Sequence, residues 1–101
     1  MNLINNNISK IKELCEKFKV NKLYAFGSVL TSRFNDESDV DILVKFQNDV
    51  TYHLYADLFF GLHNALESLF GRKVDLVDEE ALRNKYFIEE LNNTRQLIYG
   101  H

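Results

Sequence analysis

The chain has 101 residues, a length that fits one compact domain, so we expect a single domain over residues 1–101. Hydrophobic residues make up 46% and charged residues 27%, which favours a packed core and excludes a globally disordered chain. The formal net charge of −3 excludes the broad basic field of a general DNA- or RNA-binding protein, so we expect no strong nucleic-acid binding.

The single cysteine and the shortness of the apolar runs indicate the cellular location. Cys15 excludes an internal disulfide framework, and we interpret it as a small core residue of a helix rather than a reactive thiol. The amino terminus lacks the pattern of a signal peptide, and the densest apolar run, residues 58–62, is too short to span a bilayer. We therefore expect a soluble, cytoplasmic protein that makes no use of a membrane.

Alternating periodicities predict helices and strands in regular succession. The asparagines at positions 5–7 suit a helix start, and helical spacing then predicts a first helix over residues 8–19. We expect further helices over residues 28–34, 51–70 and 79–92, the last continuous or with one break, and strands over residues 22–26, 39–46, 73–77 and 96–99. This order predicts an α/β (α+β) fold, in which a small mixed β-sheet of about four strands is flanked by helices.

Two of these segments have well-defined faces. On strand 39–46 one face carries Val40, Ile42, Val44 and Phe46, and the other carries Asp39, Asp41, Leu43 and Lys45. On helix 51–70 a broad apolar stripe consists of Tyr52, Tyr55, Leu58, Phe59, Leu62, Leu66 and Leu69. Phe60 lies off this stripe, and we expect it to belong to an exposed patch for a partner.

Gly27 and Ser28 stand between a predicted strand and a predicted short helix. A glycine at that point lets the backbone approach a phosphate closely, and the N–H groups that follow belong to a helix start. Taken alone, the pair also fits a plain turn.

Asp39 and Asp41 open an otherwise apolar strand. A spacing of two sends both carboxylates to the same face, where their like charges destabilise the fold unless a cation lies between them. Oxygen ligands of this kind suit Mg²⁺ or Mn²⁺ rather than zinc. The alternative is a solvated sheet edge that happens to carry two acids.

Asp75 is a lone acid in the strand predicted over residues 73–77. If that strand lies beside strand 39–46, its carboxylate joins the pair, and three carboxylates can hold the two metal ions used for in-line phosphoryl displacement. Taken alone, Asp75 also fits an exposed strand acid.

These segments resemble the DNA polymerase β superfamily of nucleotidyltransferases, and most closely its minimal nucleotidyltransferase (MNT) group. The resemblance rests on Gly27 and Ser28, a spacer of ten residues, the Asp39-Val40-Asp41 motif and the later Asp75 in a strand. In element order it extends over nearly the whole chain.

The resemblance implies a nucleotidyltransferase fold and a role for each of these residues. Gly27 and Ser28 would hold the β- and γ-phosphates of an NTP, with ATP expected as the substrate. Asp39, Asp41 and Asp75 would be the catalytic residues and the ligands of two Mg²⁺ ions, with Mn²⁺ as a substitute. MNT proteins often pair with a HEPN-domain toxin, which they adenylylate on a tyrosine as its antitoxin.

One position departs from the family pattern. Many MNT members carry arginine directly after Gly-Ser, whereas this chain has Val29. Arg33, about a turn and a half along the predicted short helix from Ser28, is the candidate that replaces this cation at the nucleotide. The alternative for Arg33 is a surface residue with no nucleotide contact.

Several other polar residues are interpreted as structural. His53 and His63 lie ten residues apart on the predicted helix, nearly three turns, so they cannot share a metal ion. Arg72 and Lys73 could steer phosphates, but we interpret them as a solvated turn.

The sequence therefore predicts a Mg²⁺-dependent enzyme that moves AMP from ATP onto a hydroxyl of a partner protein, as the antitoxin of a HEPN toxin. The predicted strands and their covering helices use up the chain, so the acceptor is expected to be a macromolecule that docks itself or a molecule held at a subunit interface. A homodimer or a hetero-oligomer is compatible with this prediction. The alternative function is a weak or inactive antitoxin that neutralises its partner by binding, and a transferase acting on nucleic-acid ends is disfavoured by the acidic charge.

Overall fold

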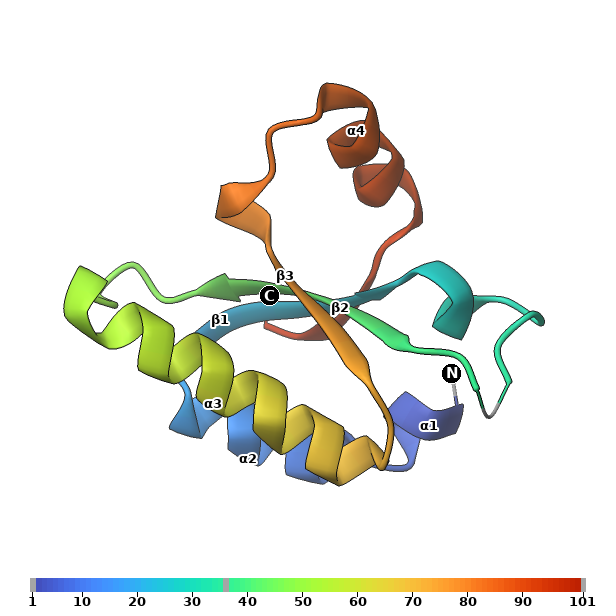
Figure 1. Cartoon of the computed structure of the whole chain (residues 1–101), viewed down its shortest axis with the longest axis horizontal. Coiled ribbons are helices and arrows are strands. Elements are labelled where there is room, and N and C mark those ends of the chain that lie inside the picture. Colours follow the sequence, from blue (N-terminus) through green and yellow to red (C-terminus); the bar gives the residue numbers. More distant parts are fainter. Residues whose placement is uncertain (1, 36, 101) are drawn as a thin grey trace.

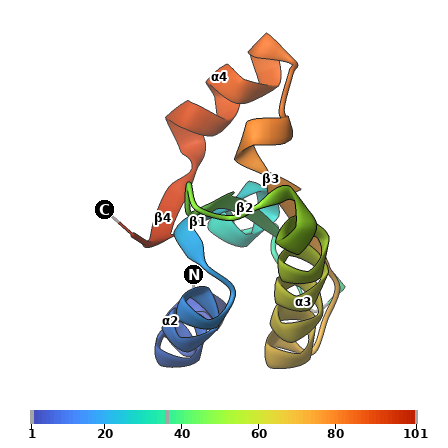
Figure 2. The same ribbon diagram turned by 90° about the vertical axis from the view of Figure 1, so that its left-hand side faces the viewer.

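The chain folds into three layers around a four-stranded sheet, as the computed structural model shows for residues 2–35 and 37–100 (Figure 1). The strands are β1 (Val20–Phe26), β2 (Val40–Phe46), β3 (Val74–Asp78) and β4 (Gln96–Tyr99). The α-helices are α1 (Asn2–Asn5), α2 (Ile8–Lys17), α3 (Tyr52–Phe70) and α4 (Lys85–Thr94), and two short 3₁₀ helices are η1 (Gly27–Leu30) and η2 (Glu79–Ala81). Helices α2 and α3 cover one face of the sheet, and α4 lies across the other (Figure 2).

The strand order is β3-β2-β1-β4, and the sheet is mixed. Strand β1 pairs in antiparallel fashion with β2 and β4, whereas β2 and β3 are parallel. A parallel pair needs a crossover, and α3 provides it, because 19 helical residues span about 28 Å and return the chain to the end where β2 began. This crossover brings the start of β3 next to the start of β2.

Two hydrophobic clusters hold the layers together. The larger cluster lies between the sheet and α1, α2 and α3, and its fully buried side chains include Ile4, Ile11, Leu23, Val40, Ile42, Val44, Leu62 and Leu66. The smaller cluster lies between the sheet and α4 and consists of Tyr24, Phe26, Leu43 and Leu91. The two faces predicted for β2 are therefore confirmed, because Leu43 and Ile42 belong to different clusters.

The predicted four-strand α/β arrangement is confirmed, but the amino-terminal helices differ from the prediction. Helix α1 is absent from the sequence prediction, and the Asn7 side chain makes no capping hydrogen bond to α2; its amide group donates to Leu3 O (2.8 Å). The helix predicted over residues 79–92 has the one break that the prediction allowed, with extended backbone at Leu82 and Asn84 between two elements. The Asn84 side chain then caps α4 by accepting hydrogen bonds from the N–H groups of Tyr86 and Phe87.

Two further expectations are corrected. The short helix predicted over residues 28–34 ends at Leu30, because Thr31 is extended. Tyr52, placed in the apolar stripe of the third helix, is 92% exposed, because it lies in the first turn of α3, beyond the edge of the sheet core. Phe60 is exposed, as expected from its position off that stripe.

Side chains of α3 hold the first residue of β3. His63 Nε2 donates to Val74 O (2.9 Å), and Val74 N–H donates to Glu67 Oε2 (2.9 Å). His63 and Glu67 lie one helical turn apart, with 3.4 Å between Nε2 and Oε2. The strand that carries Asp75 is therefore fixed to α3 by polar contacts as well as by apolar packing.

No helix in the described part of the chain combines the length and the apolar character needed to cross a membrane.

Leu66→Ala is expected to lower the free energy of unfolding by about 2–5 kcal/mol, because Leu66 is fully buried beneath the sheet and its truncation leaves a cavity. Leu54→Ala on the same helix is the matched control, because Leu54 is 46% exposed and its truncation should change stability by about 0.5 kcal/mol or less. Urea unfolding of both variants tests the packing of α3, and equal losses would contradict it.

Candidate active site

The three predicted aspartates gather at one end of the sheet. Asp41 is the partner of Asp75 in the parallel register of β2 and β3, and it is the partner of Phe26 in the antiparallel register of β1 and β2. Gly27 follows Phe26 directly, so the Gly-Ser pair ends its strand beside Asp41. The sequence predicts these residues at strand ends, and the fold brings them to the same end.

The aspartates lie on the face of the sheet that α4 covers. Alternation along β2 places Asp41 on the side of Leu43, which belongs to the cluster under α4, and alternation along β3 places Asp75 opposite the buried Val74 and Leu76. Asp39 and Asp75 are exposed, and Asp41 is half-buried. A molecule in solution can therefore reach all three carboxylates.

Gly27 makes room for the Asp41 carboxylate. Its φ is +72°, in the left-handed region, and a Cβ atom built on it would overlap with Asp41 Oδ2. Any other residue at position 27 would therefore be strained and would displace the carboxylate. The glycine is required here by the neighbouring aspartate as well as by the turn.

The local electrostatics disfavour ionised Asp41. Burial raises the pKa of the Asp41 carboxyl above its ordinary value, and the negative charges of Asp75 and Asp39 raise it further. The three carboxylates thus interact as like charges, with Asp41 at the centre.

The donor chemistry fits a hard divalent cation. Among residues 2–35 and 37–100, no three His, Cys, Asp or Glu side chains are already arranged around a common point that could hold a metal ion. Asp41 is nevertheless close enough to Asp39 and Asp75 for repulsion, and its Oδ2 lies against Gly27, where a side chain would displace it. A cation between the carboxylates would offset this repulsion, and all-oxygen ligands suit Mg²⁺ or Mn²⁺.

The segment after the Gly-Ser pair is anchored in the core. Thr31 closes η1 by donating to Ser28 O from both its N–H and its hydroxyl (2.9 Å each). Val29 is buried in the larger cluster, so the residue after Gly-Ser faces the core in this chain and not a phosphate. Arg33 is exposed and lies beyond η1, so the expected continuous helix from Ser28 to Arg33 is wrong.

Helix α4 lies beside the site and contacts the sheet through a small number of side chains. Its Phe87 ring meets Phe26 edge-on, with 6.3 Å between centroids, and Phe26 directly precedes Gly27. Arg95, after the helix, lies over the Tyr24 ring (4.1 Å) and pairs with Glu79 (2.5 Å). Periodicity and motifs give no sign of these contacts, because they join residues far apart in the chain with no common pattern.

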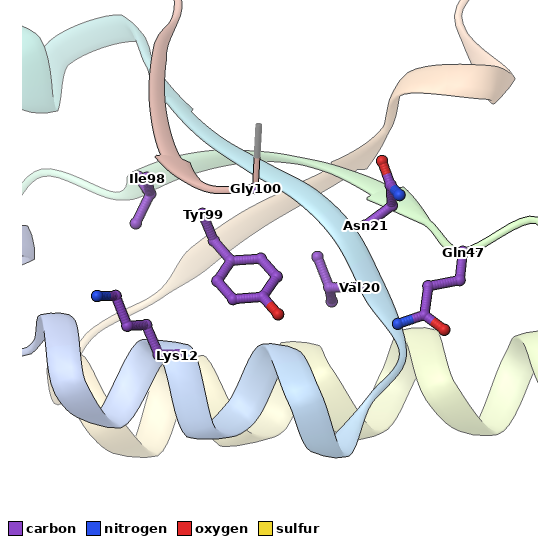
Figure 3. A pocket seen from close by; sticks show the side chains of 7 residues that line it. All are labelled: Lys12, Val20, Asn21, Gln47, Ile98, Tyr99 and Gly100. Carbon is purple, nitrogen blue, oxygen red and sulfur yellow. The ribbon is translucent and has the colours of Figure 1, made fainter.

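One cavity lies away from the aspartates. A depression of about 630 Å³ lies between α2, β1 and β4, lined by Lys12, Asn21, Gln47 and Tyr99 among others (Figure 3). The Tyr99 ring points toward α2, and Lys12 reaches up from that helix. Asn21 lies near the start of β1, whereas Gly27 follows its end, so this cavity and the aspartates occupy opposite ends of that strand.

Comparison with known proteins bears on this arrangement. A family profile described as polymerase beta, nucleotidyltransferase, matches residues 9–101. The chain belongs to this nucleotidyltransferase family. The resemblance inferred from the Gly-Ser pair and the three aspartates is therefore confirmed at the level of the family.

Two relatives and one solved structure are especially similar. MJ0128 of Methanocaldococcus jannaschii, provisionally named a protein adenylyltransferase, is 39% identical over 88 residues, which cover 87% of this chain and 84% of that protein. The protein adenylyltransferase MntA of Thermococcus cleftensis is 37% identical over 73 residues, covering 72% and 70%. An MNT antitoxin in complex with the tri-AMPylated Shewanella oneidensis HEPN toxin shares the fold (TM-score 0.67, 22% identity, covering 97% and 73%).

Gly27→Ala is expected to lower both the stability and the Mn²⁺ affinity, because the new methyl group is strained and displaces Asp41. Gly71→Ala is the control for strain alone, since Gly71 has φ +67° and an added Cβ atom would meet no atom of the described residues within 4 Å. Urea unfolding should show a loss of about 1–2 kcal/mol in Gly71→Ala and a larger loss in Gly27→Ala. Wild-type Mn²⁺ affinity in Gly27→Ala would contradict this account of the glycine.

Asp41→Asn is expected to stabilise the metal-free protein at neutral pH. The folded-state pKa of Asp41 is raised, so its protonated form stabilises the fold at low pH, and this contribution is lost as the pH rises through that pKa. Asparagine carries no charge, so the gain in Tm over wild type should be present at pH 7 in EDTA and should shrink on acidification. Asp57→Asn, at an exposed position of α3, is the control for the substitution itself. A lower Tm for Asp41→Asn at pH 7 would contradict the electrostatic account.

Proposed function

We propose that this nucleotidyltransferase is a Mg²⁺-dependent protein adenylyltransferase that moves AMP from ATP onto a hydroxyl, that of a tyrosine, of a partner protein. The observation that supports it best is the lateral pairing of Asp41 with Asp75 in a parallel register, with the Asp41 carboxylate packed directly against the backbone of Gly27. The two relatives described above both carry the name protein adenylyltransferase, one of them provisionally.

In this proposal Asp39, Asp41 and Asp75 hold two Mg²⁺ ions, and Mn²⁺ can replace them. Bound there, the ions supply charge neutralisation for the triphosphate and for the attacking oxygen. Gly27 and Ser28 bind the β- and γ-phosphates, and Arg33 is the candidate cation that reaches the nucleotide in place of the residue at position 29. Residues 27 and 28 suit this role because Gly27 is exposed and has no side chain in the way.

The reaction joins the acceptor oxygen to the α-phosphorus of ATP. The bond from that phosphorus to the bridging oxygen of the β-phosphate breaks, and pyrophosphate leaves. The acceptor proton passes to Asp75, whose carboxylate is exposed and can release it to water. Asp41 orients the reacting groups from its half-buried position between the other two carboxylates.

A macromolecular acceptor is supported by the openness of the site. Asp39 and Asp75 are both exposed at the end of the sheet, so a small acceptor would find little enclosure between their carboxylates. The HEPN toxin bound to the Shewanella MNT protein is described as tri-AMPylated. We propose that the partner of this chain is likewise a HEPN-domain toxin, and that the chain acts as its antitoxin in the cytoplasm.

The test is transfer of label from α-³²P-ATP to a HEPN-domain protein, with Mg²⁺ present. Asp41→Asn should reduce the rate by about three orders of magnitude, because losing metal-based stabilisation of several kcal/mol corresponds to such a factor. Asp57→Asn removes an exposed carboxylate away from the site and should transfer AMP at the wild-type rate.

The same variants distinguish the proposed enzyme from the alternative, an antitoxin that neutralises its partner by binding alone. If wild type transfers no label, yet wild type and Asp41→Asn both neutralise the toxin in cells, the chain works by binding and the proposed enzyme is wrong. The burial of Val29, which leaves position 29 without a phosphate-facing cation, is the observation that favours this alternative.

A further inference from the structure

We propose that Arg72 is a positioning residue for the metal site, because it ties the segment before β2 to the start of β3 and so fixes the backbone on both sides of Asp39. The inference rests on the proposed function of the aspartates. The sequence alone indicates a solvated turn at Arg72, and the residue does lie in a bend, half-buried, where its guanidinium makes specific contacts that the sequence does not indicate.

Arg72 contacts one short segment of the chain at three points. Its Nη1 donates to Asn35 O (2.8 Å) and to Ser38 O (3.1 Å). Its guanidinium carbon lies 4.7 Å from the centroid of the Phe34 ring. The segment precedes Asp39 directly, and Arg72 lies shortly before Asp75, so the contacts join the two parts of the chain that carry the aspartates.

The segment held by Arg72 is itself closed by local hydrogen bonds. Ser38 N–H donates to Asn35 O (3.1 Å), and Asn35 N–H donates to Ser38 Oγ (3.1 Å). Glu37 N–H donates to Asn35 Oδ1 (2.8 Å). Because Asn35 and Ser38 are bonded to each other, Arg72 anchors them as one unit.

Asp39 lies between two ties to the start of β3. On one side Ser38 O accepts from Arg72, and on the other Val40 N–H donates to Lys73 O (3.0 Å). The Asp39 side chain is exposed, so its direction depends on the backbone that these two ties fix. Removal of Arg72 leaves the tie at Val40 to act alone, and Asp39 then loses its fixed position relative to Asp41 and Asp75.

The chemistry of arginine suits this role. A planar guanidinium can stack flat on an aromatic ring while its N–H groups donate to carbonyl groups in its plane, whereas an ammonium has no plane to stack. Arg72 Nη1 is already engaged with two carbonyls, so positioning accounts for it without a phosphate contact. The two roles differ in one measurable respect: a phosphate contact affects binding of ATP, whereas a positioning residue affects binding of metal in the absence of nucleotide.

The experiment measures Mn²⁺ binding without nucleotide, by EPR of the free ion, in wild type, Arg72→Ala, Arg72→Lys and Arg83→Ala. Arg83 is the matched control, because its Nη1 also donates to two carbonyls, Glu80 O (2.8 Å) and Leu82 O (2.9 Å), but within the connection between η2 and α4. Arg72→Ala should weaken Mn²⁺ binding by about 10–100-fold, the loss typical of removing a group that orients metal ligands. Arg72→Lys should fall between wild type and Arg72→Ala, and Arg83→Ala should bind Mn²⁺ like wild type.

Addition of millimolar guanidinium to Arg72→Ala should restore part of the Mn²⁺ affinity, which a general loss of folding would not allow. Wild-type Mn²⁺ affinity in Arg72→Ala overturns the proposal, and so does a rise in the KM for ATP with unchanged Mn²⁺ binding, which would indicate a phosphate contact. If wild type binds Mn²⁺ but transfers no AMP, the proposed function fails, and the Mn²⁺ titrations still decide the role of Arg72.

Discussion

The parallel pairing of β2 with β3 is the constraint on which the site depends. It sets Asp41 beside Asp75 on two neighbouring strands. The antiparallel pairing of β1 with β2 then brings Gly27 against the Asp41 carboxylate. The pairing is possible because α3 is long enough to carry the chain back along the sheet. A slip of β3 by one residue would turn Asp75 to the buried face and Val74 toward the carboxylates, so the register of one short strand decides whether the acids meet.

The same pairing places like charges close together, and the hydrophobic packing of the fold offsets their repulsion. Ionised Asp41 is disfavoured by its burial and by its two acidic neighbours, yet its strand is held on the other face by Val40 and Ile42, which are fully buried. The larger hydrophobic cluster thus supports a group that destabilises the fold in the absence of a cation. Such a division, with stability on one face of a strand and reactive groups on the other, is typical of functional sites.

Much of this arrangement can be predicted from local sequence, because strand alternation and helix periodicity are local properties. Alternation in β2 separates Ile42 from Asp41 without any knowledge of the partners. The register of β3 and the contacts of Arg72 could not be predicted, since they join residues more than thirty positions apart. The burial of Val29 could not be predicted for the same reason, because it depends on packing in the larger hydrophobic cluster, whose members come from distant parts of the chain.

The contacts of His63 and Glu67 with Val74 have a consequence for how the protein behaves at high concentration. Among the described residues β3 is an edge strand of the sheet, and an edge with unpaired backbone groups is a template for aggregation with another chain. At Val74 both backbone groups are already occupied by these two side chains. Protection against edge-to-edge aggregation at Val74 therefore depends on His63 and Glu67, which lie four residues apart on α3. Substitutions at these two positions can change the aggregation tendency of β3.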